Sequence, residues 1–245
     1  LGISERDKEN RKINILQSLD KSKSEILNII PNNFTFFKRM SFNKNVINNN
    51  YNIFINNENV QEKKLDSIFF GVKEIGEVNI NGESILIFDY ANFEIEDYLK
   101  SFNQLTKYRE QKIYSGSNLN LSEFDILDFK VSKSFKYVTK INSFLILSND
   151  LNVIQNLILN YNNKSLISYD ENFIKFLEYV PDKTTYFEII NNAENEDNKD
   201  FPYWFSNYEL KGNSNFKSLY TTPSFGLKKN KNLNLKFSKK LKNEI

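Results

Sequence analysis

The sequence predicts an α+β protein in which antiparallel β-meanders are packed on one face by short amphipathic helices, with this unit internally repeated. Three observations lead to this prediction. Apolar residues alternate over short stretches bounded by turn residues, which is typical of strands. Between these stretches, apolar residues recur at helical spacing. In addition, one pattern of helix, proline, turn and strand occurs twice in the 245 residues.

The repeated pattern lies at residues 27–37, LNIIPNNFTFF, and at residues 177–187, LEYVPDKTTYF. Proline cannot continue a helix because it lacks the amide hydrogen and clashes with the preceding turn. Each copy therefore predicts a helix end followed by an aromatic strand. The identical pairs are Leu27/Leu177, Pro31/Pro181, Thr35/Thr185 and Phe37/Phe187.

The repeat divides the chain into three predicted segments. Residues 1–25 form a polar lead-in and a helix, and residues 26–175 form a first α+β unit. Residues 176–245 form a partial second unit with a basic C-terminal strand, which we expect to be incomplete or completed by another chain.

In the first third of the chain, residues 15–30 keep helical spacing, and Ser22 with Glu25 matches a capping box. After the Pro31 stop, residues 34–40 are predicted to form a strand. Residues 51–55 and 67–72 are read as two further strands. Residues 76–80 and 84–90 are predicted to form a hairpin, because Asn81-Gly82 suits a two-residue type I′ turn.

Asn92 is predicted to open a helix whose buried face includes Ile95 and Leu99. The later elements follow from the same signals, with Asp150 and Asp170 as predicted helix N-caps. The predicted strands are residues 112–114, a meander at 124–130, 135–138 and 144–147, and then 184–190, 204–210, 217–222 and 233–237.

Composition excludes several classes of function. The chain has 33 Lys and Arg against 31 Asp and Glu, so its net charge of +2 favours no nucleic-acid partner. It has no Cys and no His, which excludes a disulfide, a usual zinc site and a Ser-His-Asp triad. No stretch reaches the ~18 apolar residues of a membrane span. We therefore expect membrane association only through a partner or a removed N-terminal anchor, and no cofactor.

Aromatic residues provide the one candidate binding surface. Phe34, Phe69 and their aromatic neighbours lie in predicted strands and are interpreted mainly as core, with an apolar ligand pocket as the alternative. A second cluster follows a polar loop and includes the only Trp of the chain. It is the predicted partner or ligand surface, although ordinary packing also explains it. Its members are Phe201, Tyr203, Trp204, Phe205 and Tyr208.

Acidic and basic clusters give no catalytic or metal prediction. Glu94, Glu96 and Asp97 fit the acidic first turn of a helix better than a pair of catalytic carboxylates. The acidic residues 194–200 lack the spacing of a calcium loop and are read as a solvated loop. The Lys-rich residues 228–242 are read as a solvated edge strand rather than a phosphate site.

Two further stretches support a family resemblance: residues 142–151, NSFLILSNDL, lead into a helix, and residues 164–173, KSLISYDENF, lead to the repeated VPDKTTYF. Over residues 26–190 the chain resembles uncharacterised exported, lipoprotein-like proteins of flavobacteria and their relatives. The resemblance implies a location in the periplasm or at the outer membrane, and a cytoplasmic location is the alternative. It implies no catalytic residue.

From these observations we expect a non-enzymatic binding or scaffold protein, an accessory subunit of a bacterial cell-envelope assembly with a protein partner. The alternative is a sugar- or lipid-binding module that uses the aromatic residues 201–208. A carboxylate-based hydrolase is a third reading, which requires two acids converging in one cleft.

Overall fold

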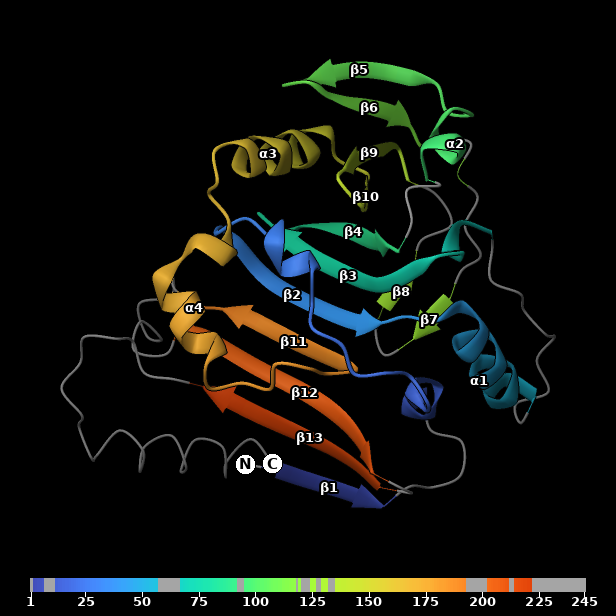
Figure 1. Ribbon diagram of the computed structural model, residues 1–245, viewed down its shortest axis with the longest axis vertical. Helices are drawn as coiled ribbons and strands as arrows, with labels where there is room; N and C mark the ends of the chain where they lie inside the picture. The colour runs from blue at the N-terminus through green and yellow to red at the C-terminus, as the bar shows by residue number, and fades with distance from the viewer. Residues whose placement is uncertain are drawn as a thin grey trace.

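The computed structural model describes residues 2–6, 12–56, 67–91, 95–117, 119, 124–126, 129–131, 135–192, 202–211 and 214–221. Its main feature is an 11-stranded sheet in which every described pairing is antiparallel (Figure 1). With several short helices packed on it, the fold is α+β, as predicted. In sheet order the strands are β1 (Gly2–Arg6), β13 (Ser214–Thr221), β12 (Tyr203–Lys211), β11 (Tyr186–Asn191), β2 (Phe34–Ser41), β3 (Val72–Ile80), β4 (Glu83–Tyr90), β10 (Phe144–Ser148), β9 (Tyr137–Ile141), β6 (Gln111–Ser115) and β5 (Gln104–Tyr108).

Helices cover both faces of this sheet, so the prediction of one covered face is wrong. The α-helices are α1 (Lys44–Asn56), α2 (Ile95–Leu99), α3 (Leu151–Asn162) and α4 (Glu171–Leu177). The 3₁₀ helices are η1 (Lys12–Leu16), η2 (Ile26–Asn28), η3 (Ser67–Phe69) and η4 (Ile167–Tyr169), and β7 (Phe124–Ile126) pairs with β8 (Phe129–Val131) in a separate small sheet.

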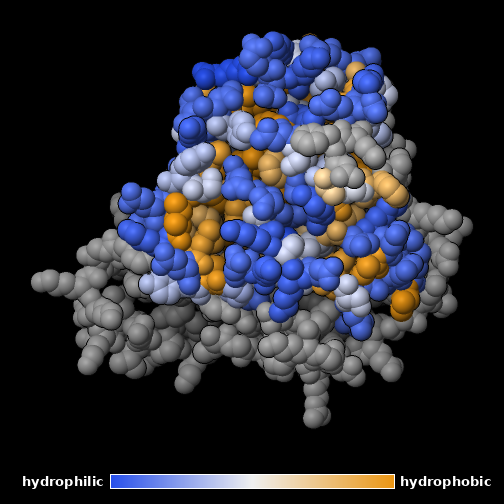
Figure 2. Space-filling view, viewed as in Figure 1, coloured by the Kyte–Doolittle hydropathy of each residue, from blue (hydrophilic) through white to orange (hydrophobic). Residues whose placement is uncertain are grey.

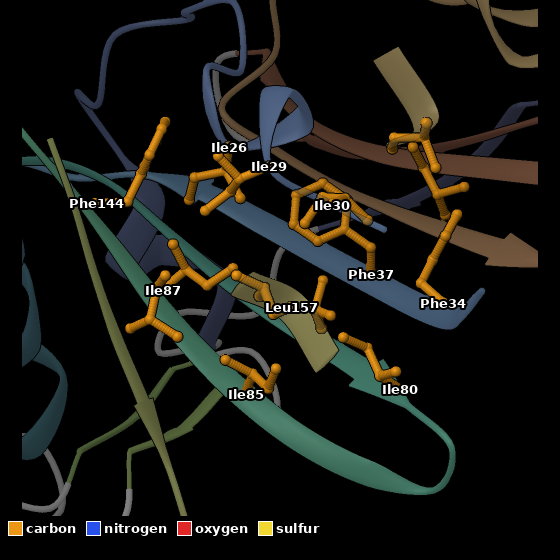
Figure 3. Close-up of a cluster of buried hydrophobic side chains, with 14 of the residues drawn as sticks. Ile26, Ile29, Ile30, Phe34, Phe37, Ile80, Ile85, Ile87, Phe144 and Leu157 are labelled. Carbon is orange, nitrogen blue, oxygen red and sulfur yellow. The ribbon is translucent and has the colours of Figure 1, made fainter. Parts of the chain in front are cut away.

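Each face has its own hydrophobic core. We call the face that packs against η2, α3, η4 and α4 the α3 face, and the face that packs against η1, α1, η3 and α2 the α1 face. Along β10, Phe144 and Ile146 belong to the α3 face while Leu145 and Leu147 belong to the α1 face. This alternation explains why β10 is apolar at nearly every position although it is antiparallel. On the α3 face, Ile26 and Leu157 contact the sheet close to Phe37 and Ile87 (Figure 3).

The predicted hairpin is confirmed. Strands β3 and β4 pair from Ile80 and Glu83 outwards, around Asn81 and Gly82. Both turn residues have positive φ, +54° and +86°, as a type I′ turn requires. The Asn79 side-chain oxygen also accepts a hydrogen bond from the Gly82 amide at 3.2 Å.

The two copies of the proline pattern lie side by side in the sheet. Strand β2 follows Pro31, β11 follows Pro181, and the two strands pair antiparallel with Tyr186 opposite Met40. Each strand also begins a meander, β2–β3–β4 on one side and β11–β12–β13 on the other. One continuous sheet therefore runs through both predicted units.

Residues 15–30 do not form the predicted helix, because tertiary contacts hold this segment in another conformation. Only η1 and η2 are helical there, separated by an extended stretch in which Ser22 forms a β-bridge with Thr184. The predicted capping box is also wrong. In a capping box the Ser22 hydroxyl would accept a hydrogen bond from the Glu25 amide, but this amide donates to Glu74 and the Ser22 hydroxyl accepts from Arg39.

Two predicted strands are helical instead. Residues 51–55 lie in α1, where Ile47 and Tyr51, one helical turn apart, pack on the α1 face. Asn50 holds this helix against η1, because its side-chain amide donates to the carbonyl oxygens of Ile15 at 3.0 Å and Gln17 at 2.6 Å. Residues 67–69 form η3, and strand β3 begins only at Val72.

The later elements follow the predictions more closely. Asp150 caps α3 through the Asn152 and Val153 amides, and Asp170 caps α4 through the Phe173 amide. The predicted meander is wrong in its first part, because β7 and β8 form their own small sheet. The predicted strand at residues 233–237 lies outside the described residues.

Candidate functional site

The predicted aromatic surface is divided between the two faces of β12. Tyr203 is buried on the α3 face, with its ring centroid 5.0 Å from that of Phe173 and 5.5 Å from that of Phe176. Burial, reinforced by the Asp170 carboxylate, raises the pKa of Tyr203 to about 12. Phe205 is buried on the same face and stacks on Phe187 at 5.0 Å. These two rings therefore belong to the core and not to an exposed surface.

The other members of the aromatic cluster are placed differently. The Trp204 side chain is half-buried, and it points to the opposite side of β12 from Tyr203 and Phe205 because neighbouring residues of a strand alternate. Phe201 and the side chain of Tyr208 lie outside the described residues. Of the five predicted residues, Trp204 is the one whose described side chain reaches solvent.

The acids at the start of α2 do not face each other across a cleft. Glu96 pairs with Lys140 on β9 at 2.6 Å, and Asp97 pairs with Lys100 at 2.6 Å. The hydrogen bonds from these lysines lower the pKa of both carboxyls. Within the described ranges, no group of three or more His, Cys, Asp or Glu residues is arranged to hold a metal ion. Glu94, the acidic residues 194–200 and the lysines at 228–242 lie outside those ranges.

A buried ion pair joins four segments on the α3 face. Arg39 of β2 is 0% exposed, and its Nε donates to Glu74 of β3 at 2.9 Å. Its other nitrogens donate to the Thr184 carbonyl oxygen, at 2.7 Å, and to the Ser22 hydroxyl. Glu74 also accepts hydrogen bonds from the Ser24 hydroxyl and from the Glu25 amide. The pair thus fixes the extended segment before η2 against the sheet, which is a structural role.

A second polar row crosses the α1 face of the sheet. Lys38 of β2 lies 2.8 Å from Glu77 of β3, and its Nζ is 5.0 Å from the ring centroid of Phe129. On the other side of Lys38, Glu188 of β11 accepts hydrogen bonds from Tyr186, at 2.6 Å, and from Ser206, at 3.1 Å. Glu188 is hydrogen-bonded to neighbouring side chains and Glu77 is ion-paired with Lys38, so these residues also have a structural role.

Three solvent-open hollows are found along the described surface. The first, about 400 Å³, lies between the start of α1 and the η3–β3 connection and has the exposed ring of Phe70 at its mouth. The second, about 740 Å³, lies between α2 and strands β5, β6 and β9, with lysines, amides and two glutamates, Glu96 and Glu110, in its walls. Both glutamates are paired with lysines, Glu96 with Lys140 and Glu110 with Lys107. The third, about 440 Å³, lies between the end of α3 and η4.

Exposed apolar side chains gather at α4. Tyr169, Ile174 and Tyr179 are all exposed, and we call them the α4 face. Hydrophobic side chains gather over α4 on the left of the view in Figure 2, and others lie on the right over α1, among polar side chains. Exposed apolar groups that lie together on a polar surface are typical of a docking site.

Comparison of the chain with family models, curated proteins and solved structures finds no match to any of the three. Among the helices that the structure describes, none has the length and apolar character needed to cross a bilayer.

Sequence reasoning missed the residues that stand out in the structure. Phe70 was grouped with Phe69, yet Phe69 is fully buried and Phe70 is 71% exposed. The available signal was Gly71, whose φ of +79° turns the chain between η3 and β3. Ile174 is exposed because it lies off the side of α4 on which Phe173 and Phe176 are buried.

Proposed function

We propose that the chain is a non-enzymatic binding or scaffold protein that holds a protein partner through the α4 face. The supporting observation is the exposure of Tyr169, Ile174 and Tyr179 together on η4, α4 and the turn that follows. Removing such side chains from water on docking is favourable by ~25 cal/mol per Å² of apolar surface. Aromatic residues at the centre of an interface commonly supply much of its binding energy.

The non-enzymatic part of the proposal is supported by the placement of the charged residues. Four carboxylates are each paired with a Lys or Arg side chain: Glu74, Glu77, Glu96 and Asp97. The pairs of Glu74 and Glu77 join the neighbouring strands β2 and β3, and the pair of Asp97 lies within one helical turn. A cell-envelope assembly as the setting rests on the family resemblance. Fractionation of the source cells tests that setting, and recovery of the protein only in the cytoplasm would contradict it.

The partner proposal is tested by a native pull-down with matched variants. Ile174→Asp places a charge on the α4 face without opening the core, because its side chain is exposed. We expect a stoichiometric protein captured by the wild type to be lost with this variant. Ile53→Asp is the control, since Ile53 is also exposed, 64% against 44% for Ile174, but lies on α1. A partner retained by Ile174→Asp, or a protein that purifies alone, would refute the α4 face.

A sugar- or lipid-binding module at residues 201–208 stays the alternative, with Trp204 as its supporting residue. Titration of Trp204→Ala with candidate ligands tests it. If Trp204→Ala binds such a ligand as tightly as the wild type does, the ligand site is not at Trp204.

We also propose that the two helix–proline–strand patterns are copies of one repeated unit. The support is that each copy opens a meander and that β2 and β11 are neighbours. Proline restricts the unfolded chain, so Pro31→Ala and Pro181→Ala should each lower stability by about 0.4–1 kcal/mol. Denaturant unfolding measures both, and a large loss for one with none for the other would contradict equivalent roles.

A further inference from the structure

The most exposed large apolar side chain at a described hollow is Phe70. Its ring is 71% exposed, whereas the preceding Phe69 is buried and packs against Phe42 and Phe88 at 5.5 and 5.4 Å. Burying a Phe side chain is favourable by roughly 1.5–3 kcal/mol of free energy, but the fold itself does not bury Phe70. The ring is therefore available to a molecule that enters the hollow.

The backbone around Phe70 is held firmly. The Tyr90 hydroxyl donates to the Ile68 carbonyl oxygen at 2.6 Å, and the Ala91 amide donates to the Gly71 carbonyl oxygen at 2.8 Å. Gly71 takes a φ of +79°, a left-handed conformation that glycine adopts without strain. Two hydrogen bonds and a turn thus hold the backbone that bears Phe70, which fixes the point from which the ring leaves the chain.

Hydrogen-bond donors and hydrogen-bond acceptors both line the same hollow. Asp20 and Asn45 are exposed, and within the described residues their side chains make no hydrogen bond or ion pair. Asn43 caps α1 through its Oδ1, at 3.1 Å from the Asn45 amide nitrogen and 3.3 Å from that of Val46, which leaves its NH₂ group to donate. Lys44 places its Nζ 5.7 Å from the Phe70 ring centroid. One carboxylate acceptor together with amide and ammonium donors therefore lines the same hollow as the Phe70 ring.

This combination favours one class of small molecule. An inorganic anion would meet the Asp20 carboxylate and would find the first amides of α1 already bonded to Asn43. A wholly apolar molecule would leave these polar groups desolvated and unpaired, which costs free energy. A sugar ring satisfies both needs. Its C–H face packs on the electron-rich face of an aromatic ring, and its hydroxyl groups both donate and accept hydrogen bonds.

We propose that the hollow at Phe70 binds a pyranose sugar unit, stacked on Phe70 and hydrogen-bonded by Asp20, Asn43 and Asn45. The volume of about 400 Å³ lies near the lower end of the ~300–1,000 Å³ range of small-molecule sites, which suits about one or two sugar rings. This site is separate from Trp204 and from the α4 face.

Isothermal titration of the full chain with cellotriose, maltotriose and chitotriose tests the proposal. We expect at least one of these trisaccharides to bind the wild type, and Phe70→Ala to weaken that binding at least about tenfold. Asp20→Ala should weaken it several-fold by removing the acceptor. Because Phe70 and Asp20 are exposed, both variants should keep the wild-type melting temperature. Ile53→Ala, another exposed apolar side chain, is the matched control and should bind as the wild type does.

Three results would overturn the proposal: no binding of any of the three sugars to the wild type, equal binding by Phe70→Ala and the wild type, or loss of binding in Trp204→Ala while Phe70→Ala binds normally. The last result would place the sugar at residues 201–208. Because Phe70→Ala and Ile174→Asp change different surfaces, failure of this proposal and failure of the α4 partner are distinguished directly.

Discussion

Lys38 and Arg39 are consecutive cations of β2 that point to opposite faces of the sheet, and each meets an acid of β3. Arg39 and Glu74 on the α3 face are 0% and 3% exposed in their side chains, and Arg39 bonds to three partners. Lys38 and Glu77 on the α1 face are 7% and 20% exposed, and the Lys38 ammonium lies over the rings of Phe36 and Phe129. The two pairs therefore differ in burial and in the number of segments they join.

The difference follows from the two side chains. A guanidinium has donors fixed in a plane, so one residue can bond to a carboxylate, a carbonyl and a hydroxyl in different segments. An ammonium is a compact charge that suits one carboxylate and an aromatic ring face. On the α3 face Arg39 thus holds the non-helical Ser22 segment, whereas on the α1 face Lys38 pairs with Glu77 of the neighbouring strand and lies over Phe129 of β8.

The largest expected effect is that of Arg39→Met. It leaves Glu74 buried without its cation, so we expect a loss of about 3–5 kcal/mol in the free energy of unfolding. Urea unfolding measures this loss. The double variant Arg39→Met with Glu74→Met should recover part of it, since no buried charge remains. A loss below about 1 kcal/mol for the single variant would show that the pair is not the main tie on this face.

Gly76→Ala tests how tightly the α3 face is filled beside that pair. A Cβ at this position would lie 2.9 Å from Cδ1 of Ile26 and 3.0 Å from Cε2 of Phe37. Both neighbours are buried, so we expect about 1–3 kcal/mol of destabilisation from overpacking. Thermal unfolding measures it, and an unchanged melting temperature would mean that η2 moves away from the sheet freely.

Lys38→Met should have a smaller effect than Arg39→Met. Its partner Glu77 keeps partial contact with water, and the methionine can still pack against Phe129, so we expect a loss of about 1 kcal/mol. The same urea series measures it. Equal losses for the two variants would remove the distinction between the faces.

The last expected effect is a dependence of stability on pH. Burial raises the pKa of Glu74 above its ordinary 4.5, against the opposing effect of Arg39. Between 4.5 and the raised value the folded state holds a proton that the unfolded state has lost, so this group makes stability fall as pH rises through that window. Glu74→Gln removes the titrating carboxyl, so the free energy of unfolding of this variant should not fall with pH in that window. Parallel curves for the two proteins would contradict the raised pKa.

Local signals predicted the parts of the fold that depend on neighbouring residues. Asn81-Gly82 fixed the hairpin, and Asp150 and Asp170 cap the helices predicted from them. Each of these signals acts within a few residues and is little affected by the rest of the chain.

The misassigned segments depend on contacts from far along the chain. The capping box at Ser22 failed because Ser22 bonds to Arg39 and bridges to Thr184, neither of which its own segment can reveal. The strand predicted at 51–55 failed because alternation of Asn with apolar residues hid the helical spacing of Ile47 and Tyr51. The predicted surface at residues 201–208 was misjudged at Tyr203 and Phe205 because the sequence does not show that α4 and β11 cover them.

The pairing of β2 with β11 has a consequence for synthesis on the ribosome. These neighbours lie far apart in the sequence, so β2 can pair with β3, and β3 with β4, early, but β2 must wait for β11 (Figure 1). At ~5–20 residues per second of translation, that wait is on the order of ten seconds. Throughout it, the nascent chain offers an unpaired strand edge rich in aromatic residues, which is where another chain can add. This edge of β2 therefore lacks its own partner for as long as residues 42–185 are being made.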